Sequence, residues 1–151
     1  MMTTKNTDVV TSITNSPRRR GTWRGIIAGV IAKLIAFPIC ILIDMFIIWP
    51  ALHGTTYLSS GPVDVNSNEW FIYQIPGALT YFFIGFIAAR WSPPDSWRAP
   101  IFHMGLSLVM LFLSHLPSVD EVWRKVFWYI YPLLCIYGGA LYFKRRESML
   151  N

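Results

Sequence analysis

Charged side chains are scarce in this chain of 151 residues. Lys, Arg, Asp and Glu together make up 14% of the sequence, whereas they approach a quarter of a typical soluble domain. Apolar residue types, in contrast, make up 54%. This balance excludes an ordinary soluble globular domain and predicts a protein of the membrane.

Cysteine is also scarce, which limits the metal and redox chemistry. Only Cys40 and Cys135 are present, and both lie in the middle of apolar runs. Two cysteines cannot supply the usual four-ligand zinc spacing, and an oxidase would not reach them inside a membrane. We therefore expect neither a metal site built on cysteine nor a disulfide.

Sequence motifs of catalysis are missing as well. The chain has no nucleophile elbow, Walker loop, glycine-rich dinucleotide fingerprint or HExxH helix. Its histidines do not lie at matching depths in two apolar runs, as a bis-histidine haem would require. The net charge of +5 comes from residues that flank apolar runs, which argues against nucleic-acid binding. We expect no enzymatic activity, no cofactor and no nucleic-acid partner.

Four long apolar runs dominate the sequence. They cover about residues 25–50, 71–90, 99–116 and 123–143, and a helix of about 20 residues crosses a bilayer core of ~30 Å. Short connections favour antiparallel neighbours. We expect an all-α polytopic membrane protein with four transmembrane helices in an antiparallel bundle over residues 21–146. Residues 1–20 would form a flexible basic cytoplasmic tail, and residues 147–151 a second cytoplasmic tail.

Basic residues are distributed unevenly around these runs. Cytoplasmic loops carry the excess of Lys and Arg, and with the N-terminus inside the outer loops keep only Arg124 and Lys125. Both termini are therefore predicted to be cytoplasmic, in a layout that fits a bacterial inner (plasma) membrane. The first run is about twice as long as the apolar core of a signal peptide, so we expect it to be retained. Seven flanking residues are expected to set the topology and contact lipid headgroups: Arg18, Arg19, Arg20, Arg24, Lys144, Arg145 and Arg146.

Two charged residues, Lys33 and Asp44, lie inside the first run. A charge in hydrocarbon costs about 2.5 to 3.5 kcal/mol on insertion scales, so such residues are candidates for a functional site. They share one helix face but stand roughly 16 Å apart along the axis. Lys33 either extends to the inner headgroups or bonds to Tyr81 or His103.

Asp44 has no comparable route to water, because its side chain is short. It is either protonated or bonded to polar groups of other spans, with Gln74, Tyr73, Ser114 and His115 as candidate partners. The structural interpretation is a contact between helices, and the functional one is proton or cation handling. The candidate intramembrane polar site comprises Asp44, Lys33, Gln74, Tyr81 and His103.

Two histidines, His53 and His115, are predicted at the same outer level of the membrane. With Asp44 or Asp120 nearby they have the ligand types that zinc prefers. Histidines at helix ends are more often simply solvated. We keep His53 and His115 as a candidate outer-face site and expect no metal there.

Three functions of different kinds fit these features. The first is a membrane protein without catalysis, which acts through helix contacts in the bilayer as an accessory, regulatory or protective partner. The second is a small oligomeric carrier or channel that moves protons or ions with Asp44. The third, a membrane enzyme acting on lipid or quinone, requires His53, Asp44 and His115 to converge. The expected partners are the lipid bilayer and another membrane protein or a second copy of the chain.

Overall fold

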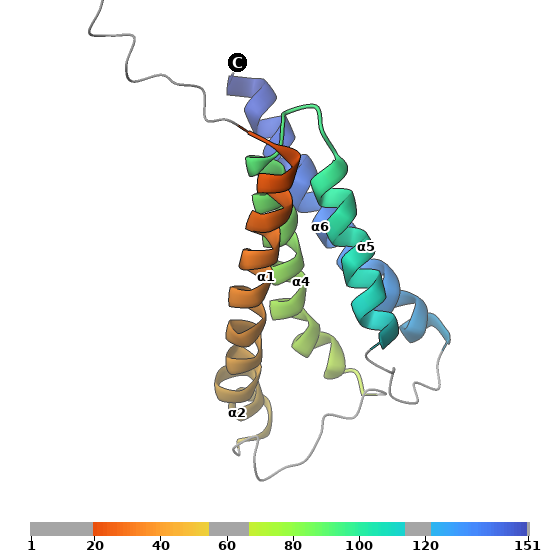
Figure 1. Ribbon diagram of the computed structural model, residues 1–151. Helices are drawn as coiled ribbons and strands as arrows, with labels where there is room; N and C mark the ends of the chain where they lie inside the picture. Colours follow the sequence, from red (N-terminus) through yellow and green to blue (C-terminus); the bar gives the residue numbers. More distant parts are fainter. Residues whose placement is uncertain (1–19, 55–66, 114–121, 151) are drawn as a thin grey trace, which may run out of the picture.

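Every regular element in the described part of the chain is a helix (Figure 1). The structure is a computed structural model that describes residues 20–54, 67–113 and 122–150. Helix α1 (Thr22–Ile43) continues through the π-helical turn η1 (Asp44–Ile48) into α2 (Trp49–His53), so that 32 residues form one rod. The other helices are α4 (Trp70–Trp91), α5 (Arg98–Leu113) and α6 (Val122–Leu150). The all-α prediction is therefore confirmed.

The ends of these helices follow from local chemistry. The first rod stops at Gly54, whose φ of 65° is the left-handed conformation that glycine adopts without a steric penalty. Helix α4 ends at Ser92, whose backbone is extended, and Pro93 and Pro94 follow it. Since proline lacks the backbone N–H that a helix needs, the chain turns here and starts α5.

Three helices are long and apolar enough to cross a membrane: the rod Thr22–His53, α4 and α6. Helix α5 is shorter, with 16 residues, which corresponds to about 24 Å. The last three residues of the span predicted over 99–116 lie outside the described residues. Helix α6 continues to Leu150. The prediction of a tail over residues 147–151 is therefore wrong for residues 147–150, which belong to this helix.

Consecutive helices run in opposite directions (Figure 1). One end of the molecule holds Arg20, Arg90, Arg98 and Lys144, and we call it the basic end. The opposite end, which holds His53, we call the distal end. At the basic end the Gly21 N–H donates to the Trp91 carbonyl over 3.2 Å, and this bond joins the start of α1 to the end of α4.

Helix α4 is the central element, because it packs against α1, α5 and α6. Its crossing with α6 is very close: a Cβ added to Gly85 would overlap the Ile136 carbonyl, and one added to Gly139 would overlap the Phe82 carbonyl. Small residues permit such backbone contacts between helices in lipid, where hydrophobic burial does not drive association. The core is built around this crossing, with Ile84 and Ile136 almost fully buried.

Large apolar side chains cover the outer surface. Leu34, Phe46, Leu79, Phe112 and Leu113 are each between 66% and 72% exposed. Soluble monomers rarely present so much contiguous apolar surface to water. The exposed apolar faces and the helix lengths together indicate a membrane protein.

Candidate intramembrane polar sites

The first polar cluster joins α1 to α5. Lys33 Nζ donates to Ser107 Oγ over 3.2 Å. The same ammonium lies 5.6 Å from the ring centre of Phe37 and 6.0 Å from that of Tyr81. A cation above an aromatic face is stabilised by the negative face of the ring. Lys33 is therefore drawn inward, to a hydroxyl on α5 and to the ring of Tyr81 instead of its hydroxyl.

His103 lies one helical turn before Ser107 on the same face of α5, and it is fully buried. Its Nε2 donates to the Ile26 carbonyl over 3.1 Å. The Nδ1 atom is buried and has no hydrogen-bond partner among the described residues. Gly29 makes this approach possible, since a Cβ there would overlap His103 Nε2.

The second polar cluster surrounds Asp44, at the start of η1. The Cys40 thiol donates to Asp44 Oδ2 with a separation of 3.8 Å, and the Thr80 side chain of α4 lies beside that thiol. Asp44 Oδ1 is buried without a hydrogen-bond partner in the described part of the chain. Gln74, an expected partner, is half-buried, and its side chain bonds to no described residue.

The two clusters are separated along the first rod. Lys33 and Asp44 are eleven residues apart, which is about 16 Å of helix. The structure thus brings Lys33, Tyr81 and His103 together, and Tyr81 also lies close to Cys40, the partner of Asp44.

Of the candidate outer-face site, His53 belongs to the described residues, and His115 lies outside them. His53 Nε2 is 3.2 Å from Tyr73 Oη and 3.6 Å from Glu69 Oε2. Its ring packs on Trp49 with 4.3 Å between ring centres. Nine residues separate His53 from Asp44, about 13 Å of helix, so the described residues give no convergence of these two groups. No set of three or more metal-ligating residues gathers within residues 20–54, 67–113 and 122–150.

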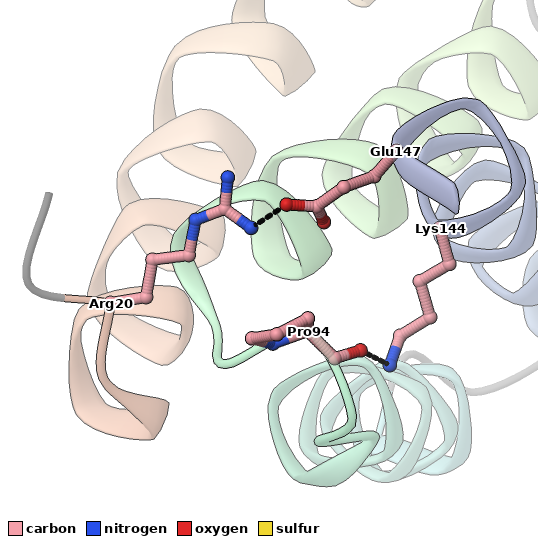
Figure 2. Close-up of polar contacts among 4 residues, drawn as sticks. All are labelled: Arg20, Pro94, Lys144 and Glu147. Carbon is pink, nitrogen blue, oxygen red and sulfur yellow. Dashed lines mark hydrogen bonds and ion pairs between the residues drawn. The ribbon is translucent and has the colours of Figure 1, made fainter. Parts of the chain in front are cut away.

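The basic end is held by contacts among several helices (Figure 2). Arg20 forms an ion pair with Glu147, and Lys144 Nζ donates to the Pro94 carbonyl over 2.6 Å. Lys144 also lies 4.6 Å from the ring centre of Trp97. These contacts tie the start of α1 and the turn between α4 and α5 to the end of α6. Of the other residues expected at the headgroups, Arg24, Arg145 and Arg146 are exposed, and Arg18 and Arg19 lie outside the described residues.

Two structural features are not among the predictions from the sequence. Gly25 and Gly29 form a G-x-x-x-G pair on which α4 and α5 pack, and this spacing is a readable signal of close helix contact. Arg124, expected in an outer loop, is only 4% exposed: it donates to the Ser67 carbonyl over 2.8 Å and lies 5.0 Å from the ring centre of Trp123. The neighbouring aromatic residues are the signal that could have indicated this burial.

Chemically, the first cluster can hold α1 against α5, and the second can hold a proton or a cation at the carboxyl group. Comparison with protein-family models, with curated proteins and with solved structures finds no match to this chain.

Proposed function

We propose that this chain is an integral membrane protein without catalytic activity that acts through helix contacts in the bilayer, as an accessory, regulatory or protective partner. The observation that carries the proposal is the use of its polar side chains. Lys33 bonds to Ser107, and His103 bonds to the Ile26 carbonyl, so both connect α1 with α5. Interhelical hydrogen bonds of this kind stabilise helix packing in lipid.

The proposed arrangement is a four-span bundle in a bacterial plasma membrane, with α5 as the shortest span and both termini in the cytoplasm. Its support is the distribution of charge. Among the described residues, the basic end holds seven Arg and Lys side chains and two acidic ones, Asp95 and Glu147, so positive charge is in excess there. Cytoplasmic ends of spans carry such an excess. The seven cations are Arg20, Arg24, Arg90, Arg98, Lys144, Arg145 and Arg146.

A partner would have a large surface on the first rod. Its inward stripe is narrow, with Gly25, Gly29 and Cys40 as the buried residues of α1. On the outward side Leu34 and Phe46 are each 70% exposed. A second membrane protein, or a second copy of this chain, could cover these side chains.

Site-specific photo-crosslinking in native membranes tests this function. A photoreactive phenylalanine analogue would replace Leu34 or Phe46 in the full chain, and Met149, 81% exposed beyond the predicted span, would carry the control. We expect adducts of one defined mass from the two positions on the first rod and not from Met149. Absence of a protein adduct from Leu34 and Phe46 would contradict the proposal.

A second candidate is a proton- or ion-coupled carrier that uses Asp44. The favouring observation is Asp44 Oδ1, which is buried without a described partner at the first residue of a π-helical turn. Such turns occur frequently at functional sites. A carrier requires the carboxyl group itself, so Asp44→Asn would abolish coupled flux while leaving the protein folded.

A further inference from the structure

A groove of about 550 Å³ lies at the basic end, between the start of α1 and the start of α5. Thr22, Ser96, Trp97, Arg98 and Ile101 are among its lining residues. The groove has one firm wall, because the Trp97 ring stacks on Tyr137 of α6 with 5.4 Å between ring centres. It is a shallow, open depression formed by the start of α1, the turn between α4 and α5, and the start of α5.

Arg98 and Asp95 are the two charged residues that line this groove, and they form no ion pair with each other. Glu147 is paired with Arg20, and Asp95 lies close enough to Lys144 to interact with its charge. The Arg98 side chain is exposed and has no ion-pair or hydrogen-bond partner among the described residues. A guanidinium presents a planar fork of donors that matches the oxygens of a phosphate group.

The groove also provides hydroxyl groups and an apolar exit. Ser96 Oγ accepts a bond from the Arg98 backbone N–H over 3.4 Å, which leaves its own O–H free to donate, and Thr22 adds a second hydroxyl. Below it, Ile101 is 60% exposed, and Gly105 one turn further along α5 faces open space. This sequence of polar groups followed by apolar surface matches a lipid headgroup and its acyl chain.

We propose that this groove binds the phosphate headgroup of an anionic phospholipid, with the Arg98 guanidinium as its principal ligand and the acyl chain along Ile101. The choice of an anionic lipid follows from the excess of cations at this end, which attracts negatively charged headgroups. The site rests only on the membrane location within the proposed function. That location is tested separately, by the resistance of the wild-type chain to extraction from membranes with alkaline carbonate.

The test is native mass spectrometry of the full chain in detergent, titrated with phosphatidylglycerol or with phosphatidylcholine. The variant is Arg98→Gln and the matched control is Arg90→Gln, which removes an equal charge from an exposed position at the same end but outside the groove. We expect Arg98→Gln to weaken retention of the first phosphatidylglycerol about tenfold, because the variant loses the charge-assisted hydrogen bonds that the guanidinium makes to the phosphate. Arg90→Gln should retain the lipid like the wild type, and Arg98→Lys should fall in between because it keeps the charge but not the fork.

Three results would overturn the site. Equal losses in the Arg98→Gln and Arg90→Gln variants would show only a general attraction by the basic end. Unchanged retention in Arg98→Gln would remove the site, and a preference for phosphatidylcholine would remove the ligand class. Helical content and the unfolding midpoint of each variant, measured by circular dichroism, establish that all are folded.

Discussion

At the scale of single residues, Lys33 and Asp44 occupy the same face of one helix and yet have different surroundings. Helical spacing predicts that shared face and the roughly 16 Å between them. It does not predict that Ser107 is the partner of Lys33, because the partner depends on how far α1 and α5 are shifted along their axes. The inward position of Lys33 follows from side-chain packing, which a periodic pattern does not contain.

The bond between Lys33 and Ser107 is testable with a double-mutant cycle. Lys33→Met, Ser107→Ala and the double variant are compared by their free energies of unfolding in detergent. We expect a coupling energy of about 0.6 kcal/mol, and no more than about 1.7 kcal/mol, as for other hydrogen bonds between membrane helices. Strictly additive effects would mean that the two side chains do not interact.

Gly29 provides a second prediction at this scale. Gly29→Ala should lower the free energy of unfolding by about 1–3 kcal/mol, because its new methyl group would overlap His103 and force the helices apart. Gly105→Ala is the matched control: open space surrounds that position, and alanine is the better helix former by about 1 kcal/mol. If both variants unfold alike, the close contact between α1 and α5 is wrong.

At the scale of elements, the apolar runs predict helices near residues 71–90 and 123–143, and the structure has α4 at Trp70–Trp91 and α6 starting at Val122. Hydropathy does not predict the extension of α6 to Leu150, because the residues that follow Phe143 are polar and yet remain helical. Hydropathy does not predict the π-helical turn η1 either. This turn leads directly into Trp49, the first residue of α2, which is only 3% exposed.

The crossing of α4 and α6 can be tested with two adjacent glycines. Gly139→Ala should lower the unfolding free energy by about 2–3 kcal/mol, because the atom in the way is the Phe82 backbone carbonyl, which cannot rotate aside. Gly138→Ala should be nearly neutral, since its nearest neighbour would be a Phe82 ring atom at 3.9 Å. Both free energies come from unfolding titrations in mixed detergent, and an equal or reversed effect would contradict the crossing.

At the scale of the whole molecule, the short connections in the sequence predict antiparallel neighbouring helices. The described helices do run in alternating directions along the chain (Figure 1). The groups that form each polar cluster are not predictable in the same way. Lys33, His103 and Ser107 meet only because Gly25 and Gly29 let α4 and α5 approach α1. A single sequence locates these glycines but does not say which helix they face.

The proposed orientation is tested with reporter fusions. A reporter that is active only in the cytoplasm should function when fused after Asn151 and should be inactive when inserted after Gly54, at the distal end. The reason is the excess of cations at the basic end. A fusion after Asn151 that is active only outside the cytoplasm would invert the topology.

The central claim is that the protein acts through helix contacts, as Lys33 does between α1 and α5, and that Asp44 does not conduct protons. Its most direct test is proton flux into vesicles that contain the purified full chain, driven by a potassium diffusion potential and followed with a pH-sensitive dye. We predict that wild-type and Asp44→Asn vesicles both match protein-free vesicles. A flux that the wild type supports and the folded Asp44→Asn variant lacks would contradict the claim.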